Sequence, residues 1–304
     1  MEREELFKSW TQPASVTEDE RMATTIKMIK SAVDSSTEIQ SLDYEVFVQG
    51  SYANKTNIKA DSDVDVCVML KSTFFTQYPK GLKDTDYGFT SGTITYDEYY
   101  RRVYRAIVNK FGSANVTKGN KSIKINSNTY HVNADVVVAF MLKNFYYNNS
   151  INPSVYVEGI KFISQDGKEV VNYPKVHIEN GKSKNNQTNY KYKKLVRILK
   201  KARSEMIEKG LVNGDKISSF LVECLVWNVP NSKISGYYTW DDTVKQAIIY
   251  LCNEIKNNAD EVKKWGEVSE ILYLFHSGRK WTVEDAEKFL VAAWNYLGYG
   301  NENN

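Results

Sequence analysis

The order in which strand and helix patterns occur along the chain limits its fold more than any other feature. Runs typical of strands occur at Tyr44–Gln49, Val64–Leu70, Tyr130–Phe140 and 155–163, all within the first 163 residues. Beyond residue 190 the spacing of apolar residues predicts helices and almost no strands. We therefore expect an α+β chain, in which a lobe with a mixed β-sheet and flanking helices precedes a helical lobe.

The two predicted lobes meet in a polar stretch. The segment from Pro174 to Asn189 is rich in turn formers, and Asn180-Gly181 is its strongest turn signal. We place the boundary there, which gives domains at residues 1–178 and 179–304. Helices are predicted at residues 17–35, 97–111, 190–209, 217–228, 240–258, 262–275 and 283–297.

Composition excludes several classes of protein. The 304 residues are 42% hydrophobic, which argues against global disorder, and the net charge of +3 is too even to indicate nucleic-acid binding. The N-terminal residues lack a signal-peptide pattern, and no run approaches the roughly 18 apolar residues of a membrane span. Cysteines and histidines are few and scattered, so we expect buried free thiols, no zinc site and a cytoplasmic protein.

Two aspartates, Asp63 and Asp65, stand two residues apart at the start of a predicted strand. Because strand residues two apart point to the same face, these carboxylates project side by side, while Val64 and Val66 face apolar packing. Two carboxylates held this close resist ionisation unless a cation lies between them. Mg²⁺ prefers such hard oxygen ligands, so the pair indicates a magnesium site.

A third aspartate, Asp135, lies in an apolar run where a casual surface acid is not expected. If its strand neighbours the first, three acids meet on one face and match the ligand set of a two-metal phosphoryl transfer. Ahead of the pair, Gly50 permits a tight turn, and the Ser51 hydroxyl with nearby backbone donors can hold a phosphate. The alternative is that Asp63 and Asp65 are ordinary charged residues at the edge of a turn, on a strand that faces solvent. Asp61 would then be a further member of the same acidic run.

The Gly-Ser turn, the Asp-x-Asp pair about a dozen residues later and the distant single aspartate together resemble the polymerase-β-like nucleotidyltransferase superfamily. The fuller pattern is similar to the bacterial cGAS/DncV-like nucleotidyltransferases, which make cyclic oligonucleotide second messengers in anti-phage signalling. The strings that carry this likeness are Gln49-Gly50-Ser51-Tyr52-Ala53, Asn57-Ile58, Asp61-Ser62-Asp63-Val64-Asp65-Val66, Tyr192-Lys193-Lys194-Leu195-Val196-Arg197-Ile198-Leu199-Lys200 and Ser218-Ser219-Phe220-Leu221-Val222-Glu223.

This resemblance implies a bilobal fold with the active site in the cleft between the palm lobe and the helical lobe. Asp63 and Asp65 would ligate both of two Mg²⁺ ions, which Mn²⁺ can replace. Asp135 would complete one metal site and help to activate the attacking hydroxyl. Gly50 and Ser51 would lie at the donor triphosphate.

The resemblance also implies nucleotide contacts in the helical lobe. Lys200 would pair with the triphosphate, Ser219 would donate to it, and Phe220 would stack on the donor base. A slip of one residue in matching these short helices would give Lys201 and Ser218 instead.

The charge pattern of the predicted helix at 190–209 supports a nucleotide contact independently of the resemblance. Lys193, Arg197 and Lys200 share one face of the predicted helix, and a cationic face directed at a cleft would neutralise a triphosphate. The alternative is a face that is exposed to solvent, and we prefer this alternative for Lys193. For Phe220, the alternative to base stacking is plain core packing. Among the abundant tyrosines, only Tyr52, directly after the Gly-Ser turn, is nominated for the pocket.

The implied activity is a Mg²⁺-dependent condensation of ribonucleoside triphosphates into a cyclic oligonucleotide, in the first place a cyclic dinucleotide, with release of pyrophosphate. The product would act on a separate effector protein, and we expect a monomer that requires neither a membrane nor a nucleic acid. The alternatives are a linear-oligonucleotide or RNA-tailing enzyme of the same superfamily and a catalytically inactive nucleotide sensor. The near-neutral charge speaks against tailing, and the presence of all three acids speaks against inactivity.

Overall fold

The computed structural model describes residues 2–13, 16–58, 63–146 and 152–301, and the chain divides into two compact units. The sheet unit consists of Ser15–Ala53 and Ser62–Val176. The helical unit consists of Met1–Ala14, Asn54–Asp61 and His177–Asn304. Two short segments from the first 61 residues therefore belong to the helical unit, although the rest of that unit follows 116 residues later in the chain.

The sheet unit is built on one mixed sheet, in which β2 and β5 run parallel and the other pairs run antiparallel. The order is β1-β2-β5-β4-β3, with β6 paired to β5 and β7 to β6. Its described strands are β1 (Tyr44–Gln49), β2 (Val64–Gln77), β3 (Val116–Lys118), β4 (Ile123–Ile125), β5 (Ala134–Asn144), β6 (Val157–Ile163) and β7 (Glu169–Asn172).

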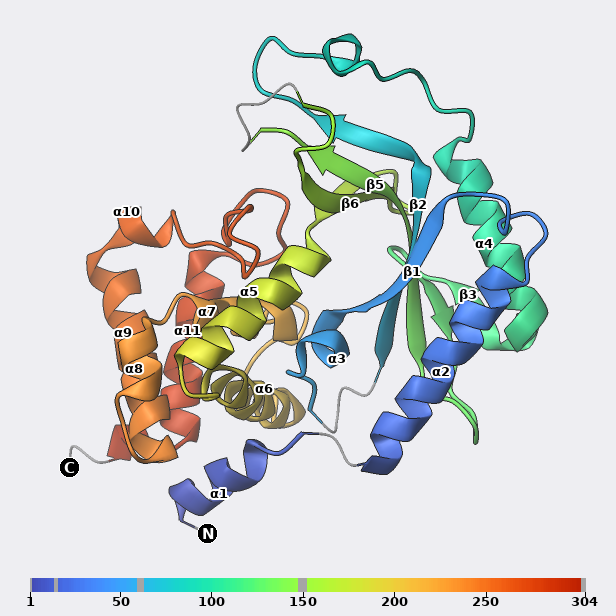
Figure 1. Ribbon diagram of the computed structural model, residues 1–304. Coiled ribbons are helices and arrows are strands. Elements are labelled where there is room, and N and C mark those ends of the chain that lie inside the picture. Colours follow the sequence, from blue (N-terminus) through green and yellow to red (C-terminus); the bar gives the residue numbers. More distant parts are fainter. Residues whose placement is uncertain (1, 14–15, 59–62, 147–151, 302–304) are drawn as a thin grey trace. The chain divides into compact units, whose positions relative to one another are not determined.

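Two long helices, α2 (Val16–Asp34) and α4 (Tyr96–Phe111), cover one face of this sheet (Figure 1). Helix α4 begins where the Thr95 side chain accepts a hydrogen bond from the Glu98 backbone, which satisfies one of the free amides of the first turn. Apolar side chains of both helices are fully buried against β2 and β5 and form the main core of the unit. The short elements are α3 (Gly50–Asn54), η1 (Asp84–Tyr87) and η2 (Ser113–Asn115).

The helical unit packs its helices around a core centred on α6, α7, α9 and α11. Helix α1 joins this core, since Phe7 is fully buried, Trp10 is 7% exposed, and Arg3 pairs with Asp241 at 2.9 Å. The helices are α1 (Arg3–Trp10), α5 (Pro174–Gln187), α6 (Tyr192–Glu208), α7 (Ser219–Trp227), α8 (Asn231–Ser235), α9 (Trp240–Asn257), α10 (Ala259–Val262), α11 (Val283–Tyr296) and η3 (Tyr299–Asn301).

Two expectations about this part of the chain are wrong. The polar stretch at 174–189 is helix α5, and Asn180-Gly181 lies inside it because the Asn180 amide donates to the Val268 carbonyl at 2.9 Å and Gly181 is buried. The predicted helix at 262–275 is mostly irregular, with an isolated bridge between Gly266 and Tyr273. Tertiary contacts override local propensity at both places. The other predicted helices are present within one or two residues of their expected ends.

The cysteines follow the expectation in part. Cys67 and Cys224 are buried free thiols, while Cys252 is only half-buried. Among the described residues, no helix combines the length and the apolar character that crossing a membrane requires.

Lys184 of α5 is a buried cation that makes the stability of the helical unit depend on pH. Its side chain donates to the Val229 carbonyl at 2.8 Å and lies 5.0 Å from the centroid of the Trp227 ring. Burial lowers the pKa of this amine from 10.5 to about 8, although Glu270 acts in the opposite direction. The folded state therefore loses the Lys184 proton at a lower pH than the unfolded chain does.

We expect the free energy of unfolding to rise with pH between about 8 and 10.5, because the unfolded chain binds the extra proton throughout that window. Relative to Lys184→Met, the wild type should gain about 3 kcal/mol across the window. Denaturant titrations of both proteins at the two ends of the window measure this gain. A difference between wild type and variant that stays constant with pH would contradict it.

Candidate functional site

Strand β2 separates its side chains onto the two faces of the sheet. Val64, Val66 and Val68 are fully buried in the core beneath α2 and α4. Cys67 and Met69 belong to a smaller apolar cluster on the opposite face, and Asp65 precedes them on that face with its side chain half-buried. The alternation predicted from the sequence thus places the Asp65 carboxylate on the face opposite α2 and α4.

The structure brings Asp65 and Asp135 together. They are register partners on the parallel strands β2 and β5, whose backbones lie about 4.8 Å apart in such a ladder. Asp63 stands one residue before β2, and its side chain is exposed. The Ser122 hydroxyl donates to Asp135 Oδ1 at 2.8 Å and so orients the third carboxylate, a contact that the sequence analysis missed.

Gly50 is required by its position against Asp65. Its φ of +69° lies in the left-handed region that favours glycine. A Cβ at this position would lie 2.0 Å from Asp65 Oδ2 and 2.8 Å from its Cγ, closer than any side chain can approach. The turn therefore brings the backbone directly against the carboxylate, which explains why glycine precedes Ser51.

The three acids supply hard oxygen donors, and in chemistry they fit Mg²⁺. Their side chains do not form a ready-made cage, because no three carboxylate, imidazole or thiolate groups converge closely enough within the part of the chain that the structure describes. Asp61, which would extend the acidic run, lies outside the described residues. Divalent metal ions prefer such oxygen ligands, and the paired acids on β2 and β5 are the described group that would suit one.

The two residues after Gly50 lie in α3 and are half-buried. Tyr52 packs against the core beneath α2 and α4. Burial raises the pKa of the Tyr52 hydroxyl, and the negative charge of Asp19 adds to that effect. Its ring thus contributes to packing in the sheet unit.

In the helical unit, Lys200 does not extend toward solvent. Its side chain is 3% exposed and forms an ion pair with Glu223 at 2.7 Å and a hydrogen bond to the Thr56 hydroxyl at 3.0 Å. A direct contact with a triphosphate would require Lys200 to leave both partners. Lys201 beside it is half-buried.

The two serines at the start of α7 differ in their positions and hydrogen bonds. The Ser218 hydroxyl caps the helix by accepting from the Leu221 backbone at 3.0 Å, whereas Ser219 is the first residue of the helix and is half-buried. Phe220 follows, and its ring lies 5.8 Å from that of His177 and 5.3 Å from the Arg279 guanidinium. Phe220 is half-buried and also packs against the apolar core of the helical unit, so its ring has both core packing and aromatic and cationic neighbours.

Lys193 of α6 is half-buried and is affected by three other positive charges of the same unit. Burial lowers the pKa of Lys193, Glu223 opposes this, and the positive charges of Lys55, Arg197 and Lys182 lower it further. Such mutual repulsion is relieved when an anion binds. The solvated face expected for Lys193 is therefore found only in part, since this side chain is half-buried and Lys55, 138 residues earlier in the chain, acts on it.

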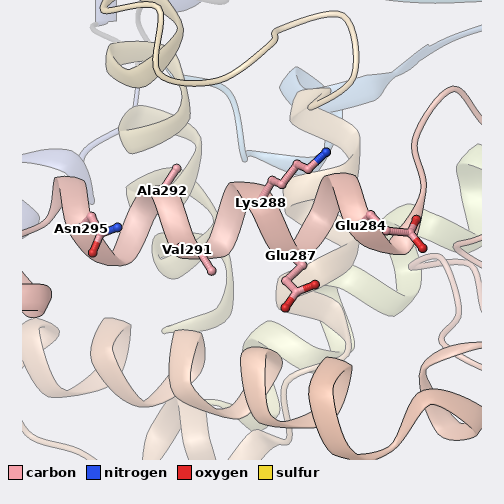
Figure 2. A pocket seen from close by; sticks show the side chains of 6 residues that line it. All are labelled: Glu284, Glu287, Lys288, Val291, Ala292 and Asn295. Carbon is pink, nitrogen blue, oxygen red and sulfur yellow. The ribbon is translucent and has the colours of Figure 1, made fainter.

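A hollow of about 560 Å³ lies along α11 (Figure 2). It is lined by Glu284, Glu287, Lys288, Val291, Ala292 and Asn295, all from that one helix. The predicted site residues do not line it.

Comparisons with known proteins agree with this architecture. A nucleotidyltransferase domain model matches residues 26–115, and the model of the cGAS/DncV-like nucleotidyltransferase C-terminal helical domain matches residues 179–298. The chain is 42% identical over 296 residues to the cyclic dipyrimidine nucleotide synthase CdnE of Cecembia lonarensis, a match that covers 97% of this chain and 98% of that protein.

Solved structures give the same result. The Rhodothermus marinus CdnE c-UMP-AMP synthase with Apcpp and Upnpp matches with a TM-score of 0.84 and 33% identity, over 98% of this chain and 97% of that one. The Elizabethkingia meningoseptica CdnE cyclic dinucleotide synthase with GTP and Apcpp matches with a TM-score of 0.79 and 35% identity, over 97% of this chain and 99% of that one. The predicted α+β fold, a polymerase-β-like domain followed by a helical domain, is confirmed.

Proposed function

Since the chain belongs to the cGAS/DncV-like nucleotidyltransferases, we propose that it joins two ribonucleoside triphosphates into a cyclic dinucleotide and releases pyrophosphate. The observation that carries this proposal is the pairing of Asp65 with Asp135 on parallel strands, directly against Gly50. The names of relatives support the reaction and leave the bases open, because they include a dipyrimidine synthase and a UMP-AMP synthase.

The reaction begins when a ribose hydroxyl attacks the α-phosphorus of a bound triphosphate. Asp63, Asp65 and Asp135 would hold two Mg²⁺ ions, which would lower the pKa of the attacking hydroxyl and stabilise the charge on the leaving pyrophosphate. The hydrogen bond from Ser122 fixes the orientation of the Asp135 carboxylate, which would help to activate that hydroxyl. The absence of a side chain at Gly50 allows the backbone to lie directly against the Asp65 carboxylate.

On the helical unit, we assign the triphosphate contact to Lys193 and its neighbours Lys55 and Lys182, in place of Lys200. Burial is the main cause of the lowered pKa of Lys193, and the positive charges of Lys55 and Lys182 add to it, so a bound polyanion would favour the charged form of Lys193. Ser219 stays the proposed hydroxyl donor, because Ser218 is occupied by capping α7. Phe220 stays the proposed stacking partner of the donor base.

The biological setting follows from the family and is part of the proposal. The cyclic product would bind a separate effector protein in cytoplasmic anti-phage signalling, and the enzyme would act as a monomer. We retain residues 1–178 and 179–304 as the proposed sequence domains, which the family-model match at residues 179–298 supports. The segments 1–14 and 54–61 then belong to the first domain in sequence while they pack in the helical unit.

Incubation of the pure protein with four labelled ribonucleoside triphosphates and Mg²⁺ tests the proposal. We expect a product that resists phosphatase, that mass spectrometry identifies as a cyclic dinucleotide, and that requires the divalent ion. A phosphatase-sensitive product would indicate the linear or tailing activity instead. Nucleotide binding without any turnover, with Mg²⁺ or Mn²⁺, would indicate a catalytically inactive sensor.

A further inference from the structure

The segment Asn54–Ile58 connects the Gly50-Ser51 turn to the aspartates of β2, since Asp63 follows five residues after its end. This segment is unusually well buried for a polar connection: Thr56 is fully buried and Asn57 is 5% exposed. Lys55 has a φ of +54°, in the left-handed region that costs a residue with a side chain about 1 kcal/mol or more. Packing elsewhere must compensate for that conformation.

Two cations of α6 bind this segment. Arg197 donates through Nη1 to the Lys55 carbonyl at 2.6 Å, and through Nε to the Thr11 carbonyl at 2.8 Å. One turn later on the same helix face, Lys200 donates to the Thr56 hydroxyl at 3.0 Å. Arg197 and Lys200 therefore share a helix face, as predicted. Arg197 binds the backbone of Lys55, and Lys200 binds the side chain of Thr56.

A buried carboxylate completes the arrangement, which we call the Glu223 network: Thr56, His177, Lys200 and Glu223. Thr56 donates to Glu223 Oε2 at 2.8 Å, Lys200 pairs with the same oxygen at 2.7 Å, and His177 Nε2 lies 3.0 Å from Oε1. Burial alone would raise the pKa of Glu223, but the charges and hydrogen bonds of Lys200 and His177 hold it below its usual range. Both oxygens of the carboxylate have partners.

Such a network specifies geometry more than it adds stability. A buried ion pair is often no more stabilising than apolar residues of the same volume, because desolvation of the charges offsets their attraction. Its directional bonds do restrict the groups that it joins to one arrangement. Here the group that would otherwise be free to shift is Thr56, on the segment that leads to Asp63.

We propose that Thr56, Lys200, Glu223 and Arg197 are positioning residues for nucleotidyl transfer: they hold residues 54–58, the stretch from which the chain leads on to Asp63 and Asp65, in one arrangement. None of the four needs to touch nucleotide or metal. This inference rests on the proposed function, and it gives Lys200 a role different from a triphosphate contact.

Thr56→Val tests the inference, because valine keeps the shape of the side chain and removes only its hydroxyl, while the pair of Lys200 with Glu223 remains. We expect kcat to fall about 10- to 100-fold, since small misplacement of catalytic groups costs rates of that order. The Mg²⁺ concentration for half-maximal rate should rise, and KM for nucleotide should change less. Thr56→Ser, which restores the hydroxyl, should recover most of the rate.

Thr243→Val is the matched control. Thr243 is fully buried in α9 of the same unit and donates to the Thr239 carbonyl at 2.7 Å, far in sequence from the network. A purely structural role of Thr56 would give both variants a similar loss of thermal stability and leave kcat per folded molecule unchanged. That result would overturn the inference.

Hydrogen exchange provides a readout that does not depend on turnover. In Thr56→Val, the amides of residues 54–58 and of 63–66 should exchange faster than in wild type and in Thr243→Val. Exchange that is unchanged at both segments would overturn the inference even if the wild type makes a cyclic product. Absence of any product from the wild type would instead overturn the proposed function, and the exchange comparison would still decide whether the network holds the segment.

Discussion

Asp65→Asn is expected to lower the rate of product formation at least about 1,000-fold, a barrier increase of roughly 4 kcal/mol. Asparagine keeps the size of the side chain and removes its negative charge, so the fold should persist while the site loses a metal ligand. The in-register position of Asp65 beside Asp135 is the reason for so large an effect, because the two carboxylates share the same face of adjacent strands. Product quantified by mass spectrometry under saturating nucleotide measures the loss.

Asp97→Asn is the control for this substitution. Asp97 is an exposed aspartate in the first turn of α4, in the same unit as Asp65. Its replacement removes the same charge away from the paired acids and should leave the rate within about twofold, as surface substitutions usually do. Equal rates for wild type and Asp65→Asn would exclude the paired acids as the catalytic site.

Gly50→Ala is expected to reduce kcat/KM about 100-fold or more. The added Cβ would meet Asp65 Oδ2 at 2.0 Å, so either the turn or the carboxylate must move. The positive φ of Gly50 adds a backbone cost of about 1 kcal/mol, which affects stability as well as activity. Displacement of Asp65 affects activity only, and the two contributions can be separated.

Gly88→Ala separates them. Gly88 has a φ of +70°, almost the same as Gly50, and a Cβ there would meet nothing within 4 Å. Both variants should therefore lose a similar few degrees of melting temperature, while only Gly50→Ala loses activity. Comparable activity of the two variants would show that contact with Asp65 is unimportant.

The aspartates show how far local geometry can be read from a sequence. The period of two along a strand is enough to place Asp65 on one face and Val64 and Val66 on the other, whatever the strand packs against. The same prediction for Asp63 stays a prediction, because β2 begins one residue after it. Asp135 needed one further assumption, that its strand lies next to β2. The structure supplies this adjacency with the register of Asp65 against Asp135.

Lys200 is a residue whose binding partner could not be predicted from the sequence. The spacing of α6 correctly indicates that Arg197 and Lys200 share a face, but the partner of that face is a segment about 140 residues earlier, at Lys55 and Thr56. A basic helix face has the same local pattern whether it binds a triphosphate, water or another part of the chain. Helical spacing therefore predicts the face and leaves its partner undetermined.

The sequence by itself determined the strand alternation that puts Asp65 opposite Val64 and Val66, the turn at Gly50 and the change from a mixed sheet to helices, because each follows from interactions within a few residues. Only the tertiary structure decided that Phe7 lies in the helical core, that Asn180-Gly181 continues a helix, and that Thr56 is held by Glu223. Those outcomes depend on contacts between residues far apart in the chain, whose energies exceed the local preferences that a sequence pattern records.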